Sequence, residues 1–303
     1  MASINGNPIV ECVPNFSEGR DSAVMEKIVE PFRRTRTVRL LDYQKDEDHN
    51  RMVVTAIGEP RFLKSAVLDA MEQAVALIDM NLHRGQHPRM GAMDVAPLVP
   101  VARVTMEEVV TLSEELAEEI AARFQVPVFL YERSARRPER KDLAAIRKGE
   151  FEGLGQKLKQ PDWQPDYGPS RPHPTAGAVA VGARSPLIAF NVNLHTNDLD
   201  IARRIAARVR HSGGGLRYCK AMGVELKQRG MVQVSMNLTD FTQTAIYRAL
   251  ELVRVEAGRY GVPVAGSEIV GLVPMAALVD CAMYYLGIEG FPMDRILETH
   301  LMN

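Results

Sequence analysis

One short segment of the chain contains two histidines, two arginines and one aspartate. It is His83-Arg84-Gly85-Gln86-His87-Pro88-Arg89-Met90-Gly91-Ala92-Met93-Asp94. A histidine has an unperturbed pKa of about 6.5 and therefore exchanges protons near neutral pH. Arginine binds carboxylates through paired hydrogen bonds. Loops held by rigid elements often carry reactive groups. The segment is therefore a candidate for acid–base chemistry on an anionic substrate; the alternative is that its side chains only satisfy the loop backbone.

A metal site is the competing interpretation of the same segment. His83 and His87 have the four-residue spacing that zinc enzymes use on a helix. Gly85 between them and Pro88 after them favour a loop, in which the two rings would not converge. We therefore expect no metal here. His49, in an acidic turn, could join either kind of site or serve only the turn.

Two other motifs predict structure rather than chemistry. The run Ser212-Gly213-Gly214-Gly215 follows a predicted helix and lacks the ending of a phosphate-binding loop. It predicts a helix end and a turn. The basic run from Arg133 to Lys141 predicts the solvated start of a helix.

Composition excludes several classes of protein. Lysine plus arginine is 37 and aspartate plus glutamate is 38, a net charge of −1, which argues against a chain built to hold nucleic acid or an anionic membrane. A hydrophobic content of 46% is typical of a globular protein. Three scattered cysteines favour a reducing compartment. With no signal pattern and no membrane-length apolar run, we expect a cytoplasmic protein.

The elements that position these segments are predicted from hydrophobic periodicity and turn residues. In the first half, Thr105 and Glu108 predict a capping box at the start of a helix. We expect strands over 9–13, 38–41, 52–57, 95–104 and 126–131, and helices over 21–34, 60–79 and 105–124. In the second half, we expect strands over 187–194, 232–238 and 262–265, and helices over 197–210, 242–260, 274–285 and 292–301.

Both halves are interpreted as strand–helix–strand–strand–helix–strand, the order of a split βαβ, ferredoxin-like unit. The predicted fold class is α+β, with two such subdomains over 1–181 and 182–303 whose sheets face a cleft between them. The boundary is expected within 160–182, which is rich in proline and glycine. Long ordered connections of this kind are usually functional.

Two long motifs carry a resemblance to a known family. They are Ile9-Val10-Glu11-Cys12-Val13-Pro14-Asn15-Phe16-Ser17-Glu18-Gly19 and His87-Pro88-Arg89-Met90-Gly91-Ala92. With shorter matches at 77–80, 165–169, 182–184, 191–194 and 271–274, the chain resembles glutamate formimidoyltransferases from about residue 9 to 301. It is similar to the stand-alone form, without a cyclodeaminase domain.

The resemblance implies a reaction and its site. The formimino group of N-formimidoyl-L-glutamate would pass to N5 of tetrahydrofolate, giving 5-formimidoyltetrahydrofolate and L-glutamate in histidine degradation. His87 matches the family's catalytic histidine and would act as general acid and base. The family's folate-binding segment maps onto Gly168, Pro169, Ser170, Arg171, Pro172, His173, Pro174, Thr175, Ala176 and Gly177. Pro172 and Ala176 replace frequent aromatics, which would remove flat contacts to the pterin.

Because the donor has two carboxylates, we take Arg51, Arg89 and Arg184 as candidates to anchor them. Tetrahydrofolate is expected as a co-substrate, with no metal, and a homodimer is expected from the family and from the frequency of such dimers. No nucleic-acid or membrane partner is expected. Two alternatives stay open: a related enzyme acting on 5-formyltetrahydrofolate, and a catalytically silent folate-binding protein of the same fold.

Overall fold

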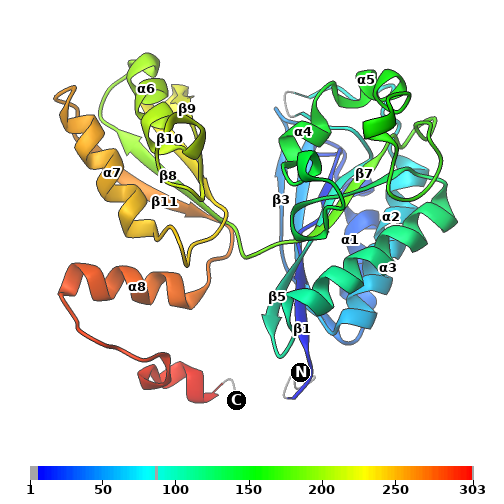
Figure 1. The fold of residues 1–303 in the computed structure, drawn as a ribbon, viewed down its shortest axis with the longest axis horizontal. Coiled ribbons are helices and arrows are strands. Elements are labelled where there is room, and N and C mark those ends of the chain that lie inside the picture. The colour runs from blue at the N-terminus through cyan, green and yellow to red at the C-terminus, as the bar shows by residue number, and fades with distance from the viewer. Residues whose placement is uncertain (1–5, 86–87, 302–303) are drawn as a thin grey trace. The chain divides into compact units, whose positions relative to one another are not determined.

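The computed structural model describes residues 6–85 and 88–301. The chain is a mixed α+β protein with two sheets, and it divides into two compact units, Met1–Arg184 and Ser185–Asn303 (Figure 1). Each unit is described separately below.

The first unit is organised around a mixed, seven-stranded sheet. Its strands are β1 (Ile9–Cys12), β2 (Asn15–Phe16), β3 (Val38–Asp46), β4 (Arg51–Gly58), β5 (Met93–Ala102), β6 (Val128–Leu130) and β7 (Val179–Ala183). Both β1 and β2 pair antiparallel with β4 on one side and β5 on the other, while β3 pairs with the outer side of β4. Beyond β5, β7 and then β6 extend the sheet in parallel.

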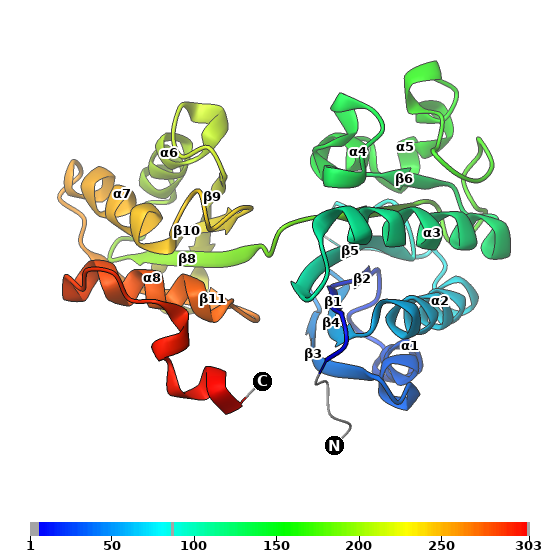
Figure 2. The ribbon, with the colours of Figure 1, turned by 60° about the horizontal axis from the view of Figure 1, so that its bottom comes forward.

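Three helices cover one face of this sheet: α1 (Ser22–Arg34), α2 (Pro60–Leu77) and α3 (Met106–Phe124) (Figure 2). The burial pattern of β4 shows that this face is the apolar one. Met52, Val54 and Ala56 point to it and are fully buried, while the residues between them are only partly buried. The capping box predicted for α3 is confirmed: Thr105 accepts a hydrogen bond from the backbone N–H of Glu108, whose carboxylate accepts one from the backbone N–H of Thr105.

Two shorter helices, α4 (Leu143–Arg147) and α5 (Glu150–Lys157), pack on the opposite face near β5, β6 and β7. There Ile146 and Leu154 contribute to a second apolar cluster with Val95 and Ala180. These two strand residues are direct neighbours in the sheet and point away from the main core. Helices α4 and α5 thus frame one side of the face on which the candidate site lies.

The basic run 133–141 does not begin a solvated helix. Two short 3-10 helices overlap it, Glu132–Ser134 and Pro138–Arg140, and Arg140 is only 1% exposed. The Arg140 guanidinium donates to the Asp166 carboxylate at 2.8 Å and to the backbone carbonyls of Asp162 and Gln164. The prediction was wrong because a buried carboxylate, far along the sequence, pairs with this arginine.

The second unit has an antiparallel sheet in the order β11-β8-β10-β9. Its elements are β8 (Ile188–Leu194), α6 (Leu199–Val209), β9 (Cys219–Leu226), β10 (Met231–Leu238), α7 (Ile246–Gly258), β11 (Val264–Val270) and α8 (Met275–Leu286). Alternate residues of β8 and β10 form one apolar core with residues of α6 and α7. The glycine run predicted as a turn follows α6: residues His211–Gly213 form a 3-10 helix and Gly214 has φ of 88°.

The predicted helix over 292–301 is not formed. Two 3-10 helices, Met293–Arg295 and Leu297–Leu301, take its place, and Leu297 is exposed. Residues 292–300 include no buried side chain, so a helix here would gain too little from packing to offset the cost of helix nucleation.

Candidate active site

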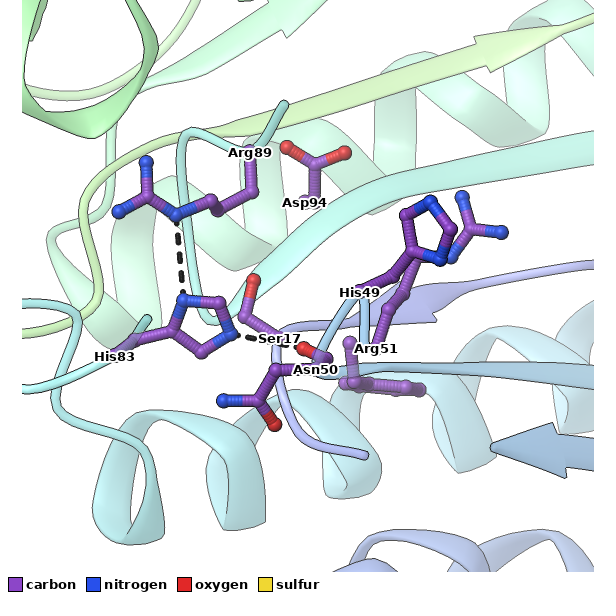
Figure 3. A pocket seen from close by; sticks show the side chains of 8 residues that line it. Ser17, His49, Asn50, Arg51, His83, Arg89 and Asp94 are labelled. Carbon is purple, nitrogen blue, oxygen red and sulfur yellow. Dashed lines mark hydrogen bonds between the residues drawn. The ribbon is translucent and has the colours of Figure 1, made fainter. Parts of the chain in front are cut away.

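A small pocket in the first unit brings together side chains from four separate stretches of the chain (Figure 3). They come from the end of β2 and the residue after it, the β3–β4 connection with the first residue of β4, the loop after α2 and the start of β5. The lining residues are Phe16, Ser17, His49, Asn50, Arg51, His83, Arg89 and Asp94.

Residues 78–92, which we call the histidine loop, connect α2 to β5 and contribute His83 and Arg89 to this pocket. Two glycines let the loop approach other backbone closely. A Cβ atom on Gly85 would lie 2.1 Å from the carbonyl oxygen of His49, and one on Gly91 would lie 2.0 Å from that of Ala178. No other residue fits at either position. His87, the predicted catalytic residue, lies outside the described residues, as does Gln86.

His83 is buried in the pocket with both ring nitrogens engaged. Its Nε2 lies 2.8 Å from the carbonyl oxygen of Asn50, and its Nδ1 accepts a hydrogen bond of 3.2 Å from Nε of Arg89. The carbonyl requires a proton on Nε2, and the arginine requires a lone pair on Nδ1. Burial, together with the positive charge of Arg89, lowers the pKa of His83. His83 is therefore a neutral, structural imidazole.

Arg89 is only 6% exposed and is held by acidic side chains of α5. Its Nη1 donates to Glu150 at 2.7 Å and to Glu152 at 2.9 Å, and its Nη2 donates to Glu152 at 2.7 Å. These hydrogen bonds lower the pKa of Glu152 to about 2. With Nε committed to His83, the guanidinium predicted to bind substrate is used within the protein.

Asp94 and Arg51 lie at the opposite side of the pocket. Asp94 is buried, accepts from the backbone N–H of Met90 at 2.8 Å, and forms an ion pair with Arg147 of α4. Burial, and then the nearby charge of Arg147, lowers the pKa of Arg51. The two guanidiniums of Arg51 and Arg147 thus lie near the carboxylates of Asp46 and Asp94.

His49 forms a histidine–carboxylate pair with Asp46 at the pocket. Its Nδ1 lies 2.6 Å from Asp46 Oδ2, and its backbone N–H donates to Oδ1 at 2.9 Å. Burial opposes ionisation of Asp46, but these two hydrogen bonds hold the pKa of that carboxyl below its ordinary value. The carboxylate orients the ring, as in many acid–base sites. Because about 43% of the His49 side chain is exposed, a ligand could reach it.

The structure brings the two predicted site segments together. The proline-rich segment, residues 168–177, runs alongside the histidine loop. Backbone hydrogen bonds join Met80 N–H to the Thr175 carbonyl at 2.8 Å and Ala92 N–H to the Ala176 carbonyl at 3.0 Å. The Asn81 side chain donates to the carbonyl of Pro174 at 2.9 Å. The loop that carries position 87 and the segment predicted to bind folate are thus neighbours.

The proline-rich segment is well fixed by its own contacts. At its start, the N–H of Val128 donates to the Tyr167 carbonyl at 2.9 Å. Near its end, Nδ1 of His173 accepts from the backbone N–H groups of Thr175 and Ala176, and burial lowers the pKa of His173. Ala176 is buried in the main core, so an aromatic at this position would not simply lie on an open ligand surface. Arg171, in contrast, is exposed.

Arg184 lies at the end of β7 and does not line the pocket. Its positive charge acts on Glu11, whose pKa is nevertheless raised because burial outweighs that attraction. Arg184 also forms a hydrogen bond with Tyr131. Of the three arginines predicted to anchor carboxylates, Arg51 and Arg89 share one pocket and Arg184 belongs to another part of the unit.

Comparison with known proteins identifies the fold family. Residues 9–184 match the formiminotransferase domain, N-terminal subdomain, and residues 189–297 match the formiminotransferase domain. The chain belongs to the formiminotransferase family. The resemblance inferred from the two long motifs is confirmed.

Several relatives align with nearly all of this formiminotransferase chain. Glutamate formimidoyltransferase of Streptococcus pyogenes serotype M1 is 51% identical over 97% of this chain and 99% of its own length. The same enzyme of Thermoplasma acidophilum is 47% identical, with 97% of each chain covered. Formimidoyltransferase-cyclodeaminase of Mus musculus is 44% identical, but only 53% of it is covered. The chain is thus similar to the stand-alone enzymes over their whole length.

Two further observations concern the described part of this formiminotransferase chain. No group of three or more His, Cys, Asp or Glu side chains there is arranged to hold a metal ion. None of the helices in residues 6–85 and 88–301 has both the length and the apolar character needed to cross a bilayer.

Sequence reasoning missed Asn50, Arg147, Glu150 and Glu152 in this formiminotransferase site. Glu150 and Glu152 are more than 50 residues from Arg89, and their local sequence predicts only an acidic helix start. Asn50 has a φ of 48° and its amide bridges Gly19 N–H and the carbonyl of Arg84, which brings the β3–β4 connection against the loop. The turn-forming character of asparagine is the one signal that could have marked it.

Proposed function

We propose that this chain transfers the formimino group of N-formimidoyl-L-glutamate to N5 of tetrahydrofolate. The observation that carries the proposal is the similarity to two stand-alone glutamate formimidoyltransferases over nearly the whole chain. The geometry supports it, because the loop that carries position 87 and the segment assigned to folate are hydrogen-bonded neighbours.

The reaction needs a proton relay rather than an oxidation. N5 of tetrahydrofolate attacks the amidine carbon and a tetrahedral adduct forms. N5 then loses a proton, the glutamate nitrogen gains one, and the bond from that nitrogen to the amidine carbon breaks. We assign His87 as the group that takes the first proton and delivers the second; such acid–base help is worth about 10²–10⁴-fold in rate. His83 and His173 are poor candidates, since internal hydrogen bonds engage their rings.

The donor carboxylates need a cationic partner at the pocket. Arg51 is our first candidate, because it lines the pocket and a second guanidinium, that of Arg147, lies near it. Arg89 would have to release Glu150 and Glu152 before it could bind a substrate carboxylate. Arg184 stays a candidate for a second anionic group. Residues 168–177 would bind folate, with Arg171 exposed to meet its negative charge.

We also infer that both units follow the split βαβ plan. The order β11-β8-β10-β9 in the second unit supports this plan. In the first unit the order is β3, then β4, then β1 and β2 side by side along the same neighbours, and then β5, which also supports it. The first subdomain would then extend through β7, just past the boundary predicted at residue 181, because β7 pairs with β5 and β6. A homodimer is our further expectation, which sedimentation of the purified chain tests.

One assay tests the proposed reaction against its alternatives. In one reaction the purified chain is mixed with tetrahydrofolate and formiminoglutamate. In a second reaction it is mixed with 5-formyltetrahydrofolate alone. Released glutamate and folate products are measured in both. Glutamate release that requires tetrahydrofolate supports formimino transfer. Turnover of 5-formyltetrahydrofolate alone supports the related folate enzyme. Folate binding without any turnover contradicts both and leaves the silent binding protein.

A further inference from the structure

Lys157, the last residue of α5, is a buried cation that binds the end of the neighbouring helix. It is only 8% exposed. Its Nζ donates to the backbone carbonyls of Ala145 and Lys148 at 2.8 and 3.1 Å and also to that of Ile146. These three hydrogen bonds use every N–H of an ammonium group. The ring of Trp163 lies against the same ammonium, with its centroid 4.0 Å from Nζ.

The burial of this ammonium carries an energetic penalty. Burial, and then the positive charges of Lys148 and Arg140, lowers the pKa of Lys157 to about 8. A methionine would fill a similar space without that penalty. What the ammonium adds is its set of hydrogen bonds, so the contribution of Lys157 lies in the three carbonyl groups that it holds.

Those carbonyls belong to the end of α4 and to the joint between α4 and α5. Helix α4 has only five residues, too few to be stable alone, and its last carbonyls have no partner inside the helix. In the joint, Glu150 has a φ of 53°, which a residue other than glycine adopts only where the surrounding structure holds it. The Glu150 carboxylate is bound to Arg89, and Lys157 fixes the other end of α5.

Lys157 also holds the backbone on both sides of Arg147, the last residue of α4. The residues immediately before and after Arg147 are two of the three whose carbonyls accept from Nζ. Arg147 in turn donates from Nε to Oδ2 of Asp94 at 2.8 Å, with a second hydrogen bond from Nη2. Because Asp94 lines the candidate pocket, Lys157 determines from outside the pocket where Arg147 meets it.

The position of Arg147 sets the charge that Arg51 experiences. The positive charge of Arg147 lowers the pKa of Arg51, and the negative charge of Asp94 acts in the opposite direction. With Arg147 in place, an ion pair neutralises the Asp94 carboxylate. If Arg147 were displaced, Asp94 would compete with a substrate carboxylate for Arg51.

We propose that Lys157 is a positioning residue for substrate binding, which fixes Arg147 against Asp94 and thereby keeps Arg51 able to bind a carboxylate of the donor. Because Arg51 is the carboxylate partner in the proposed function, the inference rests on that function. It extends the site to a side chain that does not line the pocket.

The test measures the Kd for formiminoglutamate by calorimetry with the full chain, and kcat with tetrahydrofolate. Lys157→Met fills similar space but donates no hydrogen bond. We expect it to raise the Kd and KM for formiminoglutamate about 10-fold while kcat changes by less than about threefold. A purely structural role would lower the urea midpoint without this separation of KM from kcat. If Lys157→Met does not fold, Lys157→Gln, which keeps amide donors without the charge, should raise the Kd about threefold.

A matched control and a double variant isolate the path through Arg147. Lys159→Met removes the same charge from an exposed residue two positions further along and should leave Kd and kcat unchanged. Arg147→Gln keeps an amide donor for Asp94 but removes the guanidinium. In that background, Lys157→Met should change the Kd by less than about twofold, because the side chain that it positions is gone.

Three results would overturn the inference: an unchanged Kd in Lys157→Met, a loss confined to kcat, or a 10-fold rise in Kd that persists in the Arg147→Gln background. If formiminoglutamate binds and its Kd shows the coupling between Lys157 and Arg147, but no formimino group is transferred, the inference stands and the proposed function fails.

Discussion

Nε of Arg89 donates a hydrogen bond to Nδ1 of His83 at 3.2 Å, and this contact fixes the protonation state of the imidazole. The ring must keep a lone pair on Nδ1 and a proton on Nε2, where it meets the Asn50 carbonyl at 2.8 Å. A second proton would place an N–H on Nδ1 against the N–H of a guanidinium. His83 therefore holds the histidine loop in place and is unsuited to exchange protons with a substrate.

The neutral state of His83 predicts a pH dependence of stability. Its folded pKa lies below the ordinary value of 6.5, so the unfolded chain binds more protons in that window. The contribution is fully present above about pH 6.5 and is lost as pH falls toward the lowered pKa. Urea midpoints at pH 7.5 and 5.5 should therefore differ less for His83→Gln than for the unchanged chain. An equal loss in both would show that other groups cause it.

Replacement of the proposed acid–base group should separate chemistry from binding. We expect His87→Ala to lower kcat by about 10²–10⁴-fold while the Kd for tetrahydrofolate changes little. His49→Gln provides the decisive comparison, because His49 lines the pocket and its ring is paired with the Asp46 carboxylate. If His49→Gln abolishes turnover while His87→Ala retains it, the roles of these two histidines are reversed.

Lysine should not replace the forked guanidinium of Arg89 in stabilising the fold. An ammonium cannot bind His83, Glu150 and both oxygens of Glu152 at once. We expect Arg89→Lys to lower the free energy of unfolding by about 1–3 kcal/mol. Arg84→Lys, in the same loop, changes a guanidinium that donates to the backbone carbonyls of Asn81 and His83 and should have a small effect. Equal urea midpoints for the two variants would contradict the importance of the fork.

The buried pair of Arg140 and Asp166 predicts a large loss on breaking it. Arg140→Met leaves an unpaired buried carboxylate and should cost about 3–5 kcal/mol in the free energy of unfolding. Adding Asp166→Asn should recover part of that loss, because the stranded charge is removed. Arg137→Met breaks a 3.6 Å surface ion pair with Asp162 and an exposed hydrogen bond to the Pro161 carbonyl, and should cost only about 1 kcal/mol. Denaturant titration of the three variants would show any departure from this order.

Much of the fold follows from local patterns in the sequence. The helix expected over 60–79 is α2, Pro60–Leu77, and the alternation over 232–238 marks β10. Three strands, β2, β7 and β9, have no counterpart among the predicted strands, and β2 is only two residues long. Strand β7 consists of small residues within a proline- and glycine-rich stretch, and its partners β5 and β6 are distant in sequence. Strand β9 shows only a weak alternation of polar and apolar residues.

The candidate site was predictable as segments but not as contacts. The histidine loop and the proline-rich segment could both be identified from residue types and from the family motifs. Their adjacency depends on hydrogen bonds such as Ala92 N–H to Ala176, between residues far apart in the chain. The pairing of Arg89 with α5, and the burial of Arg140, depend equally on tertiary structure. Charge alone does not show which arginine meets substrate and which meets a protein carboxylate.

The anchoring of the proline-rich segment has a thermodynamic consequence for whatever docks on it. Its start is fixed to Val128, and near its end Gly177 and His173 exchange backbone hydrogen bonds of 2.9 and 3.1 Å. A ligand therefore finds the backbone already arranged and loses little affinity to loop ordering. Ligand binding at the proline-rich segment should lack the large negative heat-capacity change of coupled folding and binding. The enthalpy of binding should therefore vary only gently with temperature.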